Sequence, residues 1–383
     1  MSAPDPIATA MQSAVETGVF PGAALLVRVR GRIVYQGAFG FAALIPEKEP
    51  ASLDTVYDLA SLTKPLATTT AVLCLVQDGR LALEDSLQDM VGELKGWAIG
   101  DATASDLLHH SSGLPAWRPF YERIAEQDRA RPGFLGSAAA REMALDLIRR
   151  EVLVSVVGSR SLYSDLGFML LGILIERIAG CSLASFCRDR VYARIGAEWL
   201  FFIETGGVPA GGPAGRPIDL KLVAPTEDDS WRGRVLRAQV HDENAYALGG
   251  VAGHAGLFGT ASAVLAISGM WLASYLGRDA FLRPELVRRF VTRQDRTPVS
   301  SWGLGWDTPS SPSSSGTQFS PHSFGHLGYT GTSLWIDPVC ELEVTLLSNR
   351  VHPTRRNNGI LQFRPLIHDL IYRELIGGKR GKN

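Results

Sequence analysis

The chain has 383 residues, of which 45% are hydrophobic and 20% charged, and its formal net charge is −1. This length and apolar content suffice for a large core or two lobes, and the balanced charge argues against nucleic acid as a partner. There is no basic, then apolar, secretory signal at the N-terminus, and no apolar run of the roughly 18 residues that a membrane span needs. We therefore expect a cytoplasmic protein without a membrane span, with a periplasmic protein as the alternative if a leader has been removed.

In the first 80 residues the hydrophobic pattern predicts a helix over residues 7–15 and then a hairpin of two long strands, 23–30 and 33–40. The six residues from Thr55 to Ala60 read as a strand-like approach. A helical run from Thr63 to Asp78 follows and closes at a glycine. Ser61 thus lies where the strand-like segment gives way to the helix.

The middle of the chain is predicted to be mostly helical. Apolar residues at spacings of three and four favour helices over residues 105–110, 138–154 and 168–178, and proline and glycine favour a surface loop over Gly206–Pro217. Later segments are predicted as helices (261–276, 284–292), a flexible loop tip (309–316), a second hairpin (332–336 with 343–349) and an amphipathic C-terminal helix (360–375).

Strands therefore gather at the two ends of the chain and helices in its middle. We predict an α+β fold in which an antiparallel sheet is built from both termini and flanked by helices, with a mostly helical lobe inserted. The expected division is a sheet lobe of residues 1–60 and 240–383 and a helical lobe of residues 61–239. Ser61 falls at this junction, where clefts tend to form.

The four cysteines are scattered, without the spacing of a CxxC pair or of a Cys/His metal site. Cys74 and Cys181 fall within apolar helical runs, where buried thiols are expected. We therefore predict reduced, structural cysteines and no metal site or other cofactor.

Ser61 and Lys64 form a possible nucleophile and base. Three residues apart at a helix start, they project from the same face, so the amine can take a proton from the hydroxyl. The helix N-terminus adds N–H groups and a partial positive charge suited to an oxyanion. The alternative is a capping serine beside a solvated lysine.

Acyl transfer also needs a second proton carrier and a strand edge that supplies another oxyanion donor. Tyr163-Ser164-Asp165 places a phenol and a carboxylate at a helix entry, about a hundred residues after Ser61. Asp165 has the alternative role of capping that helix. His326-Leu327-Gly328 precedes the last hairpin, where glycine permits close approach of a substrate backbone.

The order of these three motifs resembles that of the serine β-lactamase and penicillin-binding-protein-like superfamily. Within it the chain is most similar to the class C β-lactamase-like branch, which includes D-amino-acid peptidases and β-lactamase-fold esterases. Further matches are Leu107–Leu114, similar to the LLxHxSGL segment, and the glycine-rich Leu248–Phe258. The third motif continues as Gly325–Pro338, and the resemblance covers nearly the whole chain.

The resemblance implies that Ser61 is the nucleophile, that Lys64 is its base or base partner, and that Tyr163 carries protons to the leaving group. It also implies an oxyanion hole formed by the N–H groups of Ser61 and Tyr329. Substrate-binding positions would be Asp165, His326 and Gly328. No metal is needed.

Two residues depart from the usual pattern. Asp165 replaces an asparagine; next to Lys64 it would hold the lysine charged and raise its pKa, which opposes a neutral-lysine base. His326 replaces a lysine, so a permanent charge for a substrate carboxylate is lost, and we expect His326 to titrate near neutrality.

Several other histidines and arginines could have a functional or a structural role. His110 and His254 are expected to be buried structural histidines, and His241-Asp242 to shape the cleft rim, because no third metal ligand stands at a suitable spacing. Arg350, Arg355 and Arg356 follow the last strand and are expected to be solvated, with binding of a substrate carboxylate as the alternative.

These observations predict a serine hydrolase that forms an acyl-enzyme on small esters, amides or β-lactams; Asp165 and His326 favour an esterase or peptide hydrolase over an efficient β-lactamase. The alternative is a non-catalytic protein that binds penicillin or peptidoglycan fragments. A Ser-His-Asp hydrolase is discounted because the chain contains no G-x-S-x-G elbow.

Overall fold

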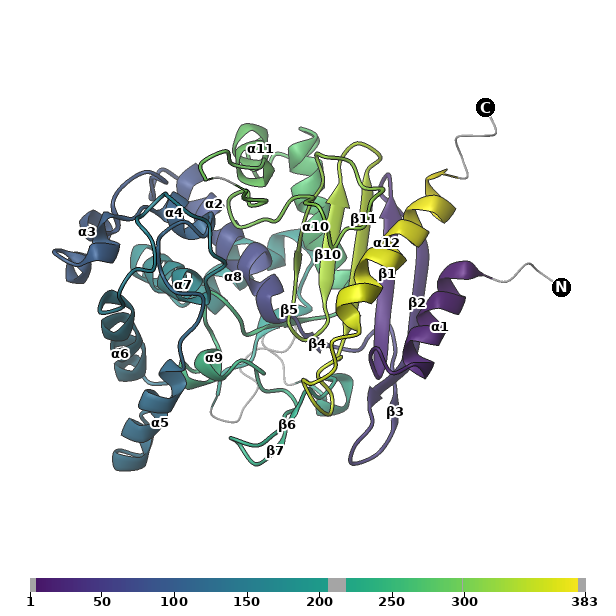
Figure 1. Ribbon diagram of the computed structural model, residues 1–383, viewed down its shortest axis with the longest axis horizontal. Helices are drawn as coiled ribbons and strands as arrows, with labels where there is room; N and C mark the ends of the chain where they lie inside the picture. The colour runs from purple at the N-terminus through teal and green to yellow at the C-terminus, as the bar shows by residue number, and fades with distance from the viewer. Residues whose placement is uncertain (1–4, 206–217, 298, 378–383) are drawn as a thin grey trace.

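The computed structural model describes residues 5–205, 218–297 and 299–377; the loop predicted over Gly206–Pro217 lies outside these residues. Its main sheet has six antiparallel strands in the order β3-β2-β1-β11-β10-β9 (Figure 1). The strands are β1 (Gly22–Val29), β2 (Arg32–Ala43), β3 (Glu49–Pro50), β9 (Phe324–Leu327), β10 (Ser333–Asp337) and β11 (Leu342–Ser348). The predicted α+β fold, with a sheet built from both ends of the chain, is confirmed.

The central strand β1 shows why the sheet is covered on both faces. Ala23, Leu25 and Val27 pack in one hydrophobic cluster with residues of α1 (Pro6–Glu16) and α12 (Ile360–Leu375). The alternate residues Ala24 and Leu26 point into the main core, which includes α10 (Ala261–Tyr275). Because side chains alternate along a strand, a sheet buried on both faces needs apolar residues at successive positions, and β1 has them.

Most of the remaining helices form the part of the molecule opposite α1 and α12 (Figure 1). They are α2 (Thr70–Gln77), α3 (Leu87–Met90), α4 (Ala104–Leu108), α5 (Phe120–Ala130), α6 (Ala138–Arg149), α7 (Asp165–Ala179), α8 (Leu183–Arg190), α9 (Glu243–Ala247) and α11 (Pro284–Val291). Two small sheets join β4 (Tyr57–Asp58) and β5 (Leu200–Phe202) to β8 (Leu257–Gly259), and β6 (Asp228–Asp229) to β7 (Arg234–Val235). The exact division into lobes stays a prediction.

Three local predictions need correction. The strand-like approach to Ser61 is a strand only at Tyr57–Asp58. Cys181 is exposed, because Gly180 ends α7 in a left-handed conformation and leaves the cysteine beyond the helix. The segment 309–316 has no regular structure, as predicted, but it is not a free loop tip: His368 of α12 donates from Nδ1 to Ser314 O at 2.8 Å.

Within the described ranges, no single helix is long and apolar enough to cross a membrane. One bent pair, Asp165–Ala179 with Leu183–Ile195, passes the combined test of length and composition, with an angle of 67° between its halves.

Candidate active site

Ser61 lies in a one-turn 3₁₀ helix, η1 (Ala60–Leu62), directly after β4. Ala60 has φ +46°, a left-handed conformation that costs energy for any residue with a side chain. Asp58 fixes this turn, because its Oδ1 accepts from Ala60 N at 2.8 Å and its Oδ2 accepts from His241 N at 2.7 Å. Ser61 therefore follows a strained turn that hydrogen bonds to the Asp58 carboxylate hold in place.

The helix predicted after Ser61 begins with a wide π turn, η2 (Lys64–Thr69), before α2 continues it. Pro65 has no N–H to donate, and the Thr70 hydroxyl donates to Pro65 O at 2.9 Å across the widened turn. Lys64 is fully buried, and its ammonium donates to Ser61 Oγ at 3.0 Å and to His254 O at 3.1 Å. The alternative of a solvated lysine is therefore wrong.

Asp165 pairs directly with this lysine, 2.7 Å from Nζ to Oδ1. It does not cap α7: the cap is Ser164, whose hydroxyl accepts from Gly167 N. Burial lowers the pKa of Lys64, but Asp165 and Tyr163 outweigh burial, and the pKa ends above its usual value. As predicted, the aspartate keeps the lysine charged in the resting site.

Tyr163 lies beside the same ammonium, which is 4.9 Å from its ring centroid, and its hydroxyl hydrogen-bonds with Ser61 and Lys64. Burial raises the pKa of the phenol above its ordinary value, although Lys64 acts in the opposite direction. The resting site therefore holds a neutral phenol, suited to passing a proton onward.

His326 lies on β9 and is buried. Its Nδ1–H donates to Leu327 O at 2.8 Å. Burial, together with the positive charge of Lys64, lowers the pKa of His326 to about 3. The prediction that His326 titrates near neutrality is therefore wrong, because an imidazolium in this position would be both desolvated and repelled.

Gly328 sits against the chain itself. A Cβ at this position would lie 1.9 Å from Thr332 Oγ1 and 2.6 Å from Leu59 O. Thr332 Oγ1 also donates to Leu59 O at 3.1 Å, and Thr330 Oγ1 donates to Asp58 O at 2.7 Å. Glycine therefore allows the third motif to dock on the backbone that precedes Ser61.

Replacing Gly328 with alanine is expected to lower the rate of Ser61 acylation about tenfold or more, because the Leu59 carbonyl must move and it is two residues from the nucleophile. Acylation rates and thermal unfolding of the variant would test this. The control is Gly92→Ala, where an added Cβ meets nothing within 4 Å. An unchanged rate in Gly328→Ala would contradict the prediction.

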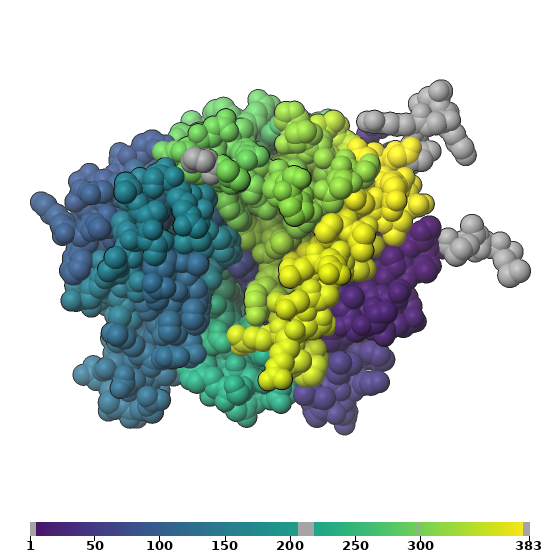
Figure 2. Space-filling view, viewed as in Figure 1, coloured from purple at the N-terminus to yellow at the C-terminus, as the bar shows by residue number. Residues whose placement is uncertain are grey.

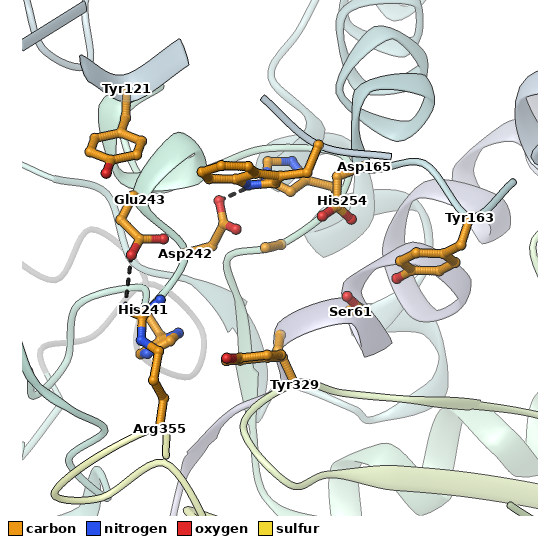
Figure 3. Close-up of a pocket in the computed structure, with 13 residues that line it drawn as sticks. Ser61, Tyr121, Tyr163, Asp165, His241, Asp242, Glu243, His254, Tyr329 and Arg355 are labelled. Carbon is orange, nitrogen blue, oxygen red and sulfur yellow. Dashed lines mark hydrogen bonds and ion pairs between the residues drawn. The ribbon is translucent and has the colours of Figure 1, made fainter. Parts of the chain in front are cut away.

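The predicted oxyanion donors are the backbone N–H groups of Ser61 and Tyr329. Ser61 lies between Tyr163 and Tyr329 (Figure 3). Among hydrogen bonds of the described residues, the N–H groups of Ser61 and Tyr329 have no protein acceptor. Their role as an oxyanion hole remains a prediction that this geometry supports.

These groups open into a cavity of about 420 Å³, and the molecular surface is hollowed between the blue and teal helical part and the yellow-green C-terminal part (Figure 2). Its lining residues are Ala60, Ser61, Trp117, Tyr121, Tyr163, Asp165, His241, Asp242, Glu243, His254, Ala255, Tyr329 and Arg355. His326 and Gly328 are not among them, so their substrate-binding role stays a prediction. The sequence analysis did not predict Trp117 and Tyr121 as cavity residues. The one signal in the sequence is that Trp117 closely follows the LLxHxSGL-like segment.

The ionisable side chains of the cavity wall pair with nearby carboxylates. The His254 ring lies 2.8 Å from Asp242, and the ring of His241 lies 3.0 Å from Glu227. Arg355 Nη2 donates to Glu243 at 2.8 Å, and Figure 3 shows Glu243 and Arg355 together at one end of the cavity. His241-Asp242 is therefore part of the rim, as predicted.

The remaining candidates lie apart from the substrate space or serve the framework. His110 is buried and its Nδ1 accepts from Ser164 N at 3.1 Å, as expected of a structural histidine. Arg350 is buried, so its expected solvation is wrong: it stacks on the ring of Tyr329, 4.5 Å from its centroid. Arg356 is exposed, as expected. Across the described residues, no group of three or more His, Cys, Asp or Glu side chains is arranged to hold a metal ion.

Partly exposed Ser61 and Tyr163 contact the buried Lys64 beside the edge strand β9, an arrangement suited to serine-based acyl transfer, and comparison with known proteins agrees. The family model described as Beta-lactamase matches residues 7–365. The chain belongs to the beta-lactamase family, and the resemblance seen in its motifs is confirmed.

Relatives and solved structures of this kind cover most of the chain. A protein of Escherichia coli (strain K12) named "Putative D-alanyl-D-alanine carboxypeptidase" is 32% identical over 360 residues, 87% of this chain and 79% of that protein. EstCE1, described as a hydrolase with promiscuous acyltransferase activity, is 21% identical with a TM-score of 0.71 over 94% of this chain and 97% of its own. The octameric penicillin-binding protein homologue of Pyrococcus abyssi is also 21% identical, with a TM-score of 0.70 over 97% and 81%. The two structures support the fold alone.

Proposed function

We propose that this protein is a serine hydrolase that acts on small esters or amides through an acyl-enzyme at Ser61. The observation that carries the proposal is the buried Lys64 ammonium, 3.0 Å from Ser61 Oγ, beside a cavity of about 420 Å³. Membership of the beta-lactamase family supports a hydrolase. The non-catalytic binder is the less supported reading, because the nucleophile, amine and phenol are all present and in contact.

In the proposed reaction Ser61 Oγ attacks the carbonyl carbon of the substrate, and its proton passes to Lys64 in the neutral form. The oxyanion is held by the N–H groups of Ser61 and Tyr329. Tyr163 then delivers a proton to the departing alcohol or amine as the acyl bond breaks, and water later hydrolyses the acyl-enzyme. Since Asp165 keeps Lys64 charged at rest, the reactive neutral lysine is a minor form at neutral pH.

The cavity offers little to a substrate carboxylate. His326 is neutral above pH 3 or so, and Arg355, the cation among the lining residues, is already bound by Glu227 and Glu243. A carboxylate substrate would have to break these pairs or remain unpaired. This supports neutral esters and amides over acidic β-lactams. The name of the carboxypeptidase relatives keeps D-alanyl peptides among the candidate amides as an exception, since a carboxypeptidase substrate carries a terminal carboxylate.

The test is incubation with p-nitrophenyl acetate and with a fluorescent penicillin, followed by intact-mass measurement and peptide mapping. We expect an acyl adduct on Ser61, none in folded Ser61→Ala, and faster turnover of p-nitrophenyl acetate than of nitrocefin. A folded protein without any adduct at Ser61 would overturn the proposal. Ligand binding that is equally tight in Ser61→Ala, without turnover, would identify the non-catalytic binder instead.

A further inference from the structure

The turn between β9 and β10 carries the predicted oxyanion donor of Tyr329, and its backbone is held at every carbonyl. From Gly328 to Thr332 each carbonyl oxygen accepts at least one hydrogen bond. The donors are Gly331 N and Arg364 for Gly328, Arg350 Nε for Tyr329, Arg350 N for Thr330, Ser348 Oγ for Gly331, and Gly328 N and Arg364 for Thr332. The Tyr329 N–H is left as a donor without a protein acceptor among the described residues.

Arg364 reaches this turn from behind the sheet. It belongs to α12, it is 3% exposed, and its Nη2 donates to Gly328 O at 2.8 Å and to Thr332 O at 2.7 Å. Within the described residues no carboxylate forms an ion pair with it; the other charge that influences it is Arg350, also a cation. Burial, with Arg350, lowers the pKa of Arg364 to about 9, so it is still protonated at neutral pH.

A buried cation without a counter-ion is costly, and replacing buried charged groups with apolar ones is often neutral or stabilising. Stability alone therefore does not explain an arginine at this position. Its contacts indicate another effect, because Gly328 O belongs to the same peptide unit as the Tyr329 N–H. A charged donor on the oxygen of a peptide draws electron density from its nitrogen and makes its N–H a stronger donor.

We propose that Arg364 is a positioning residue that polarises the Gly328–Tyr329 peptide, so that the Tyr329 N–H binds the oxyanion more strongly. The proposal rests on the proposed function, since it needs an oxyanion to form at Ser61. The positive charge also lies behind the turn, in a region shielded from water, where it favours the negative charge that develops in the transition state. Arg364 would act through the peptide and touch no substrate.

The test compares Arg364→Lys, which keeps charge and donor, with Arg364→Gln, which keeps a donor only, and Arg364→Met, which keeps neither. The readouts are kcat and KM for p-nitrophenyl acetate and the affinity of phenylboronic acid, which forms a tetrahedral anion on a serine. We expect kcat to be highest for Arg364→Lys, lower for Arg364→Gln and lowest for Arg364→Met. For Arg364→Met it should be about tenfold to a hundredfold below the wild type, because part of the oxyanion stabilisation is lost. KM should change less than about threefold, while boronic acid affinity falls in parallel with kcat.

Arg28→Met is the matched control. Arg28 also donates to a backbone carbonyl, Leu265 O at 2.7 Å, and pairs with Glu343, but it does not touch the turn. The two methionine variants are compared at equal loss of Tm. If Arg28→Met then loses as much kcat and boronic acid affinity as Arg364→Met, the effect is general destabilisation and the proposal is overturned. It is also overturned if Arg364→Gln matches the wild type. A wild-type protein that forms neither an acyl nor a boronic acid adduct at Ser61 would overturn the proposed function, and this inference with it.

Discussion

Replacing Asp165 with asparagine is expected to raise the rate of Ser61 acylation at pH 7 about tenfold or more, because more of Lys64 is then neutral. The carboxylate lies 2.7 Å from the Lys64 ammonium and holds its pKa above the usual value. Without that charge, desolvation of the fully buried amine is opposed by Tyr163 alone, so the neutral form of Lys64 becomes more favourable. Each unit by which the pKa of Lys64 falls gives about ten times more neutral base at a fixed pH.

The measurement is the pH dependence of acylation between pH 6 and 10. The wild type should gain activity toward alkaline pH as Lys64 loses its proton, and Asp165→Asn should show the same rise at lower pH. Titration of His326 should not change the acylation rate near neutral pH in either protein, since the pKa of His326 is about 3. Asp146→Asn makes the same chemical change at a surface ion pair and should leave the profile unchanged. Loss of activity in folded Asp165→Asn would show that the carboxylate takes the proton itself.

Acid is expected to destabilise the fold by about 3 kcal/mol between pH 7.5 and 5. His326 and His368 are buried, and burial, as the main cause, lowers their pKa values to about 3 and about 4. The unfolded chain binds protons at these side chains below about pH 6.5, whereas the folded chain does not, so stability falls as the pH drops. Each residue accounts for about 2 kcal/mol at pH 5.

Other buried groups also change the pH dependence of the unfolding free energy. His110 acts in the same direction, because burial lowers the pKa of His110 well below its ordinary value. Asp307 opposes it: burial raises the pKa of Asp307 to about 6, so the folded state binds a proton first and gains about 1 kcal/mol at pH 5. Burial raises the pKa of Asp58 as well, with the same sign. The histidines outweigh the aspartates in the interval from pH 7.5 to 5.

Urea unfolding at pH 7.5 and 5.0 would measure the difference. His368→Gln, on α12 and outside the cavity lining, should reduce the loss by about 2 kcal/mol, because glutamine does not titrate. Equal stability of the wild type at both pH values would contradict the prediction.

Local patterns in the sequence were sufficient for the long elements, but not for short strands such as β5, β8 and β9. Alternation in two segments split by Gly31-Arg32 predicted the first hairpin. Three-and-four spacing predicted α7 closely, and an amphipathic pattern predicted α12. These signals are short-range, and burial of one face follows directly from them. Cys181 was placed wrongly because the end of α7 depends on a single glycine in a left-handed conformation.

The sequence by itself determined the family, the order of the motifs and the nucleophile candidate, since Ser61, Lys64 and Tyr163 are recognisable by type and spacing. The sequence also predicted that Asp165 holds Lys64 charged, whereas only the tertiary structure decided that His326 is neutral and showed the contacts involved. Two contacts join residues far apart in the chain: the ion pair of Asp165 with Lys64 and the hydrogen bond from Arg364 to Gly328 O. The neutral state of His326 likewise depends on the distant Lys64. Protonation depends on which charges and carbonyls share a dry environment, and that is fixed when the sheet, α7 and α12 assemble around Ser61.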